Sequence, residues 1–181
     1  MNFRFTMSPI DTESARRELV TLSAGGYVSF EGWVRDLNEG LEVTRLEYEA
    51  FQELAVKEGD RIVGEAMLRF PVKRALCIHR VGSLALSDMA VWVGVSSIHR
   101  GEAFDACRFI IDEVKHRVPI WKKEHYRSGD SGWVNCERCA AAPLHSHAAD
   151  SLVGASLARD SPVEHSHAEH HHDRVALAHP K

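Results

Sequence analysis

The spacing of apolar and polar residues predicts several strands along the chain. Residues 27–34 and 43–50 alternate between apolar and polar side chains, as half-buried strands do. Residues 75–84 and 89–95 are short apolar runs rich in β-branched and aromatic side chains, which is typical of buried strands. Residues 120–126 are expected to be extended as well.

Apolar residues at three- and four-residue steps predict helices between these strands. The first helix covers residues 14–22 and is capped by Asp11 or Thr12. The second covers residues 51–70, where Gly59 lowers helix stability by about 1 kcal/mol. The apolar face of the second helix is formed by Phe51, Leu54, Ala55, Ile62, Ala66 and Met67.

A third helix follows the apolar run at 89–95. Ser96 and Ser97 offer hydroxyl groups that cap a helix start, and Pro119 ends the helix because its nitrogen has no hydrogen to donate. One wide apolar stripe lies between these signals and predicts an amphipathic helix. The stripe is formed by Ala103, Phe104, Cys107, Ile110, Ile111, Val114 and Val118.

The order of these elements predicts an α+β fold in one domain, residues 1–139. The strands come in adjacent pairs with short connections, such as the polar loop at 35–40, which favours an antiparallel sheet over a doubly wound parallel one. Residues 140–181 are rich in alanine, serine, histidine and charge, with few large apolar side chains. Such a segment does not bury enough apolar surface to offset the entropy cost of ordering, so we predict a disordered His-rich tail.

Composition and charge narrow the class of protein. The formal net charge is −4 and no basic stripe with interleaved aromatic residues is present, which argues against a nucleic-acid partner. No apolar run approaches the roughly 20 residues that cross a bilayer, and the N-terminus lacks the apolar core of a signal peptide. We therefore expect a cytoplasmic protein without a membrane segment, whose four cysteines are reduced thiols.

His99 and Arg100 stand at the entry to the third helix. Free N–H groups and the positive end of the helix dipole favour an anion there, and arginine adds a planar fork of donors. This predicts an oxyanion or phosphate site, with a solvent-facing polar cap as the alternative. Arg35, in a polar loop after a strand, is by itself typical of a surface residue.

Two lysines near the end of the third helix are candidate acid–base groups. Lys115 lies at the edge of the apolar stripe, and Lys122 shares a strand face with Ile120, opposite Trp121 and Lys123. Desolvation and a neighbouring cation would lower a lysine pKa and make it a usable general acid or base. A solvated basic face is the alternative interpretation.

Cysteine and histidine near the C-terminus have metal-ligand spacing. Cys136 and Cys139 form a CxxC pair, followed by His145 and His147, but one CxxC is only half of a zinc site. The His-rich tail should bind zinc or nickel adventitiously. A non-catalytic metal-handling or scaffold protein that uses these groups is therefore an alternative function, and a lysine-dependent enzyme acting on another phosphorylated small molecule is a second.

Several segments together resemble the family of molybdopterin synthase catalytic (large) subunits. The run VGVSSIHRGEAFDACRFIIDEVKHRVPIWKKE, residues 93–124, is similar to its S-x-H-R-x-x-A-F and K-x-R-x-P-x-W-K signatures. Upstream, VSFEGWVRD, LEYEAF and CIHRVGSL resemble further family segments in the same order and spacing. Cys136, Cys139 and the His-rich tail are not part of that pattern.

The resemblance implies an α+β, hammerhead-like subunit that forms a homodimer and binds one small ubiquitin-like sulfur-carrier subunit per protomer. It implies transfer of sulfur from the carrier's C-terminal thiocarboxylate to cyclic pyranopterin monophosphate, forming the dithiolene of molybdopterin in molybdenum cofactor biosynthesis. By motif position, Lys115 and Lys122 are the catalytic lysines, while Arg35, His99 and Arg100 bind the substrate. No cofactor is required by this interpretation.

Overall fold

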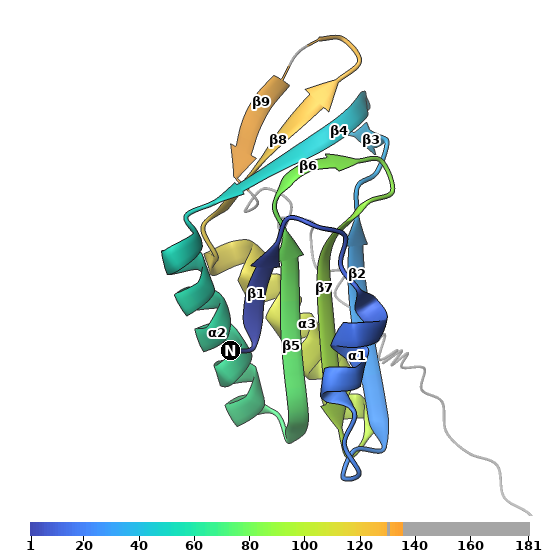
Figure 1. Ribbon diagram of the computed structural model, residues 1–181, viewed down its shortest axis with the longest axis vertical. Coiled ribbons are helices and arrows are strands. Elements are labelled where there is room, and N and C mark those ends of the chain that lie inside the picture. The colour runs from blue at the N-terminus through green and yellow to red at the C-terminus, as the bar shows by residue number, and fades with distance from the viewer. Residues whose placement is uncertain (130, 136–181) are drawn as a thin grey trace, which may run out of the picture. The chain divides into compact units, whose positions relative to one another are not determined.

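The computed structural model describes residues 1–129 and 131–135, and these residues form two sheets and three helices (Figure 1). The first sheet has the strand order β1 (Phe3–Thr6), β5 (Val72–Arg80), β7 (Met89–Ser97) and β2 (Gly26–Trp33). The second has the order β3 (Leu37–Asn38), β4 (Leu41–Ala50), β8 (Ile120–Tyr126) and β9 (Ser131–Asn135), and β6 (Gly82–Ala85) pairs with β4. The helices are α1 (Thr12–Leu19), α2 (Gln52–Arg69) and α3 (Arg100–Arg117). The predicted tail and the domain boundary before it lie outside the described residues.

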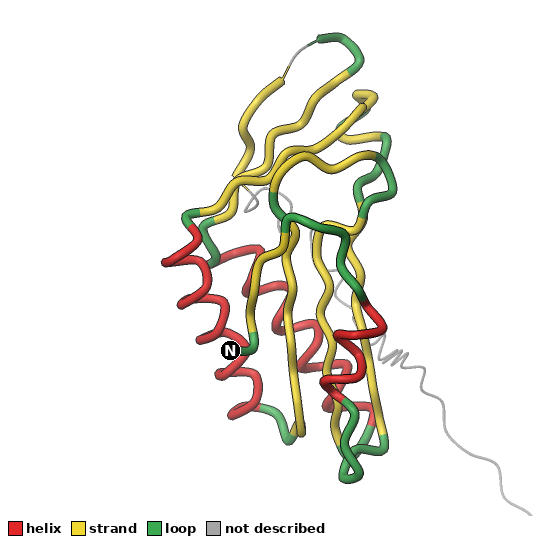
Figure 2. Tube along the Cα trace, viewed as in Figure 1, coloured by secondary structure: helices red, strands yellow, loops and turns green. Residues whose placement is uncertain are grey.

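Helices cover both faces of the first sheet, and β7 shows why (Figure 2). Its side chains alternate, so that Val93 and Val95 join a cluster with α2 and α3. Trp92 points the other way and packs with Ala15 and Leu19 of α1. Because β7 is buried on both faces, it reads in the sequence as a continuous apolar run.

The expected pairing of the neighbouring strands at 75–84 and 89–95 is confirmed, since β5 pairs antiparallel with β7. Other strands pair with partners more distant in sequence than their neighbours. β2 pairs with β7 and β4 with β8, both antiparallel, so the expected antiparallel character holds. The strand β1 is a missed element because four residues are too short for a periodic pattern. It pairs parallel to β5, with Phe3 opposite Cys77.

The predicted cap of the third helix is wrong. Ser96 and Ser97 lie inside β7, because this strand continues past Val95 to pair with both β2 and β5. His99 takes the N-cap position of α3 and makes no side-chain capping hydrogen bond. The first helix is capped as expected, since Asp11 Oδ1 accepts from the Ser14 N–H at 3.0 Å.

The apolar stripes of the helices are wider than the faces that the fold buries. Phe51 and Leu54 are 61% and 52% exposed, and Phe104 is 59% exposed, although all three were expected to be buried. The remaining stripe residues of α3 do form the core, from Ala103 to Val118. A helix that rests on a sheet buries only the side chains that face it, and these aromatic and leucine residues lie outside that sector.

Gly59 allows α2 to approach β1 closely, and its replacement should destabilise the fold. A Cβ at this position would lie 2.2 Å from Phe3 Cγ, and Phe3 is fully buried. We expect Gly59→Ala to lower the free energy of unfolding by about 1–3 kcal/mol, as overpacked cores do. Gly64, in the same helix, has open space around it. Gly64→Ala should therefore raise stability by about 0.5–1 kcal/mol through helix propensity. Urea denaturation of both variants would contradict this account if they shifted in the same direction.

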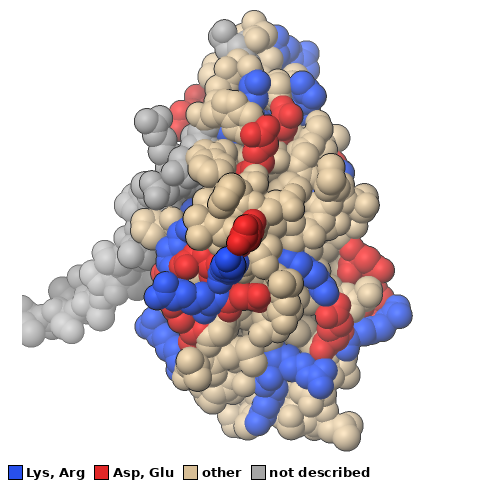
Figure 3. Space-filling model, turned by 60° about the vertical axis from the view of Figure 1, so that its left-hand side comes forward, with Lys and Arg blue, Asp and Glu red and all other residues tan. Residues whose placement is uncertain are grey.

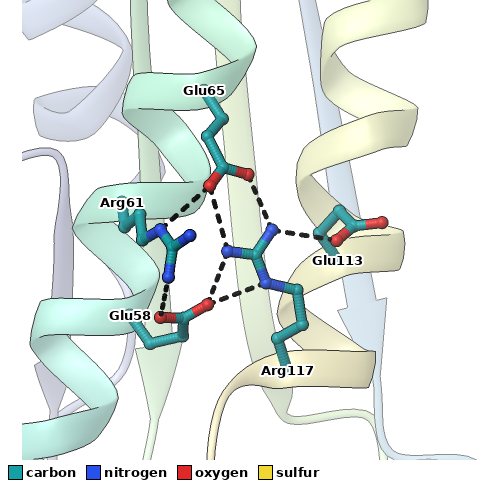
Figure 4. Close-up of polar contacts among 5 residues, drawn as sticks. All are labelled: Glu58, Arg61, Glu65, Glu113 and Arg117. Carbon is teal, nitrogen blue, oxygen red and sulfur yellow. Dashed lines mark hydrogen bonds and ion pairs between the residues drawn. The ribbon is translucent and has the colours of Figure 1, made fainter.

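An ion-pair network fixes the end of α3 against α2 (Figure 4). Arg117 Nε donates to Glu58 Oε1 at 2.7 Å, and Arg117 Nη1 lies 2.7 Å from Glu65 Oε2 and 3.1 Å from Glu113 Oε2. Arg61 Nε pairs with Glu65 at 3.1 Å. Arg117 is the last residue of α3, so the network holds the point at which the chain leaves the helix for the second sheet.

Basic and acidic side chains lie side by side on the face seen in Figure 3, over the region of α2. Along that helix, Lys57 Nζ pairs with Glu53 Oε1 at 2.8 Å, one turn away. Among the described residues, no helix is both long and apolar enough to cross a membrane.

Candidate active site

A pocket of about 250 Å³ lies where the end of β2 and the end of α3 meet the second sheet. It collects side chains from six separate elements or connections of the chain. The lining residues are Trp33, Arg35, Asn38, Val43, Leu46, Tyr48, Lys115, Lys122 and Glu124. Three of the five predicted site residues, Arg35, Lys115 and Lys122, are thus brought together.

Alternation along β8 turns Lys122 into the protein. Ile120, Lys122 and Glu124 are 2%, 7% and 2% exposed, while Trp121 between them is 40% exposed. The prediction that Lys122 shares a face with Ile120 is therefore confirmed. Pairing of β8 with β4 sets Lys122 opposite Tyr48, which lines the same pocket.

Glu124 holds Lys122 through a buried ion pair. Lys122 Nζ donates to Glu124 Oε1 at 2.7 Å. The other carboxylate oxygen accepts from Asn38 Nδ2 at 2.8 Å and from the Tyr126 hydroxyl. Burial alone would raise the pKa of Glu124, but the hydrogen bonds from Lys122 and Tyr126 lower it below its usual value. Glu124 is thus an ionised partner that orients the lysine.

Sequence reasoning missed Glu124, Asn38 and Tyr126. The signal for Glu124 was present, because a residue two positions after Lys122 in a strand lies on the same face. Asn38 reaches the site only because β3 pairs with β4 beside β8. That contact spans 86 positions in the sequence, and no local pattern predicts it.

Arg35 belongs to the same polar chain. Its Nη2 donates to Asn38 Oδ1 at 2.7 Å, and Asn38 in turn donates to Glu124. The guanidinium therefore stays at the pocket although the Arg35 side chain is largely exposed. Lys115 enters from the last turn of α3, with its Nζ 6.0 Å from the centre of the Phe30 ring.

A buried histidine lies against the wall of the pocket. His79 packs edge-on against Tyr48, with ring centroids 5.1 Å apart. Burial lowers the pKa of His79 to about 4, so the ring is neutral near pH 7, and its Nδ1 lies 2.8 Å from the Arg80 carbonyl oxygen. These contacts are those of a structural residue.

His99 and Arg100 do not reach the pocket in a single chain. They lie at the first residues of α3, whereas Lys115 lies in its last turn, roughly 22 Å away at 1.5 Å per residue. Both side chains are exposed. The backbone around them is tightly packed, since a Cβ on Gly25 would lie 2.8 Å from Ile98 O.

The pocket is suited to an anion. Three cationic side chains, Arg35, Lys115 and Lys122, face one carboxylate, Glu124. Within residues 1–129 and 131–135, no group of histidine, cysteine and acidic residues is arranged to hold a metal ion. The candidate ligands Cys136, Cys139, His145 and His147 lie outside the described residues.

The chain matches known proteins over the region that forms this fold. The profile of the family described as MoaE protein matches residues 5–117. The molybdopterin synthase catalytic subunit of Pyrococcus abyssi is 49% identical over 116 residues, which are 64% of this chain and 78% of that protein.

Solved structures agree with the sequence match. A chain in the crystal structure of molybdopterin synthase from Staphylococcus aureus aligns with a TM-score of 0.71 at 36% identity, over 74% of this chain and 97% of that chain. A chain in the complex of subunits 1 and 2 of molybdopterin-converting factor from Helicobacter pylori shares the fold, with a TM-score of 0.62 at 17% identity, over 74% of this chain and 90% of that chain. The predicted α+β fold and the family resemblance are confirmed. The chain belongs to the MoaE family.

Proposed function

We propose that this chain is the catalytic subunit of a molybdopterin synthase. It would transfer sulfur from the thiocarboxylated C-terminus of a small ubiquitin-like carrier to cyclic pyranopterin monophosphate. The observation that supports this most directly is the pocket in which Arg35, Lys115 and Lys122 meet, in a member of a family whose named relatives are molybdopterin synthase catalytic subunits. The cytoplasmic location and the absence of a required cofactor remain predictions.

The pocket supplies what the reaction needs. Each transfer exchanges a substrate oxygen for a carrier sulfur and leaves the carrier with an ordinary carboxylate. Two transfers give the dithiolene and open the cyclic phosphate. A thiocarboxylate is itself a good nucleophile, so the protein has to stabilise negative charge and deliver protons. Arg35 offers a guanidinium fork to the phosphate, and Lys122 offers an ammonium group that Glu124 holds in place.

The carrier would present its C-terminus as an extended peptide. Main-chain hydrogen bonds and the terminal negative charge are the usual means by which a groove holds such a tail. The Helicobacter pylori structure is described as a complex of two subunits. We propose a partner of the same kind here, with the thiocarboxylate directed to Lys115 and Lys122.

A homodimer would account for His99 and Arg100. They lie roughly 22 Å along α3 from Lys115, so one chain does not bring them to its own lysines. We propose that the second copy of a homodimer supplies these two residues to the pocket. The substrate phosphate would then meet Arg35 from one protomer and Arg100 from the other.

Reconstitution with complementing variants tests both proposals. Purified chain is mixed with thiocarboxylated carrier and cyclic pyranopterin monophosphate, and the fluorescent oxidation product of molybdopterin is measured. Lys122→Ala and Arg100→Ala should each be inactive. After subunit exchange, the mixed dimer contains one pocket with both residues, so activity should return.

The outcomes separate the possibilities. Wild-type chain that binds the carrier but forms no product would overturn the enzyme assignment. Active Arg100→Ala would remove Arg100 from the site. Two inactive parents that stay inactive after exchange, with mixed dimers verified by mass, would show that the residues do not combine across protomers.

A further inference from the structure

Trp33 is a large aromatic residue that stands mostly in solvent at the edge of the pocket. It is 63% exposed, yet it lines the same pocket as Arg35, Lys115 and Lys122. A buried indole stabilises a fold through its large apolar surface, and an indole that stays exposed to solvent does not make this contribution. Aromatic side chains beside a few convergent polar groups are typical of small-molecule sites.

The other three tryptophans lie elsewhere. Trp92 is 1% exposed and belongs to the core under α1. Trp121 and Trp133 lie on the face of the second sheet opposite Lys122, where Lys123 Nζ is 5.6 Å from the centre of the Trp133 ring. Trp33 is therefore the tryptophan that the fold places at the cationic pocket.

The backbone holds Trp33 and Arg35 on one side of the chain. Val34 between them is 3% exposed, and its N–H donates to the Asp88 carbonyl oxygen at 3.0 Å. Because successive side chains in extended backbone point in opposite directions, a buried Val34 leaves its two neighbours directed toward the pocket. An indole and a guanidinium are thus presented together from one fixed segment.

We propose that Trp33 stacks on the pterin ring of the substrate and selects for that ring. The inference rests on the proposed function and names a residue that would recognise the aromatic ring of the substrate. Arg35 and the lysines meet the phosphate end, where charge dominates. The flat pyrimidine ring of a pterin offers no charge to these groups but has a π-face that matches an indole.

Binding without turnover tests this role. Cyclic pyranopterin monophosphate is titrated anaerobically into the full-length chain by calorimetry, with the carrier left out so that no product forms. Removal of the ring in Trp33→Ala should raise Kd about tenfold or more, as loss of an aromatic stacking partner does for nucleobases, while Trp33→Phe should stay within about threefold of wild type. Trp133→Ala, which removes an exposed indole on the opposite face, should bind like wild type.

Each alternative result has a distinct meaning. Equal affinity of wild type and Trp33→Ala would overturn the stacking role and leave the proposed function standing. Wild-type chain that does not bind the pterin at all would overturn both. Weaker binding accompanied by loss of the dimer mass in Trp33→Ala would show that a second copy covers the indole, and the stacking role would again be wrong.

Discussion

Molybdopterin formation is expected to fall by a factor on the order of 10²–10⁴ when Lys122 is replaced by alanine, the range found for loss of a positioned acid–base group. The lysine is 7% exposed, and its ammonium group donates to Glu124 at 2.7 Å inside the pocket. In the proposed reaction, alanine would remove both the proton donor and the positive charge beside the reacting group. The change leaves Glu124 without its cation and should lower stability. Asn38 and the Tyr126 hydroxyl still donate to Glu124, so the variant should remain folded.

Lys123→Ala provides the matched control for this change. Lys123 is the next residue of β8 and points to the opposite face, where it lies over the Trp133 ring. Its loss should leave the rate near that of wild type. Single-turnover rates and thermal midpoints measured for both variants distinguish loss of catalysis from loss of the fold. A Lys122→Ala enzyme with wild-type turnover would refute the assigned role.

Glu124→Ala is expected to destabilise the protein by about 3–5 kcal/mol at pH 7, the range for removal of one partner of a buried ion pair. The change leaves the buried Lys122 ammonium without its carboxylate and frees donors on Asn38 and Tyr126. Glu124→Gln keeps an acceptor oxygen and should lower the free energy of unfolding by less than Glu124→Ala does. Glu49→Gln, at an exposed position of β4, should change stability by no more than about 0.5 kcal/mol.

The destabilisation should depend on pH in a definite direction. The pKa of Glu124 is lowered in the folded chain from its usual 4.5, so the ionised form stabilises the fold. This contribution is fully present above the unfolded pKa and is lost as the pH falls through the folded value. Urea denaturation of wild type and Glu124→Gln should therefore converge in acid, and a gap that widens as the pH falls would contradict the ion-pair account.

The strands and helices followed from local periodicity, and so did the antiparallel pairing of the neighbouring strands β5 and β7. The pairing of β2 with β7 and of β4 with β8 did not. The alternation of residues 120–126 correctly placed Lys122 inside, because a strand has only two faces. The cap at Ser96 and Ser97 failed because tertiary pairing with two neighbouring strands extends β7 beyond its apolar run. Helix-capping signals compete with strand pairing, and Ser96 and Ser97 adopt the strand.

The lysine pocket was predictable only in part. Lys115 and Lys122 were singled out by their places on the predicted helix and strand as well as by motif position, and Arg35 by motif position alone. The fold brings the three together. Motif position assigned His99 and Arg100 to the same substrate as the lysines, but α3 is long enough to separate its two ends. Spacing in a sequence does not report which end of a helix meets which sheet.

The short segment between α3 and β8 sets which side chains the cationic pocket receives. Lys115 lies before it on a helix and Lys122 after it on a strand, with the helix ending at Arg117 and the strand beginning at Ile120. Side chains on a strand alternate, so one residue more or fewer in this segment would turn Lys122 outward. A change of two residues would restore the face but shift its position along the strand. The length of this segment is therefore as much a part of the site as the two lysines that it joins.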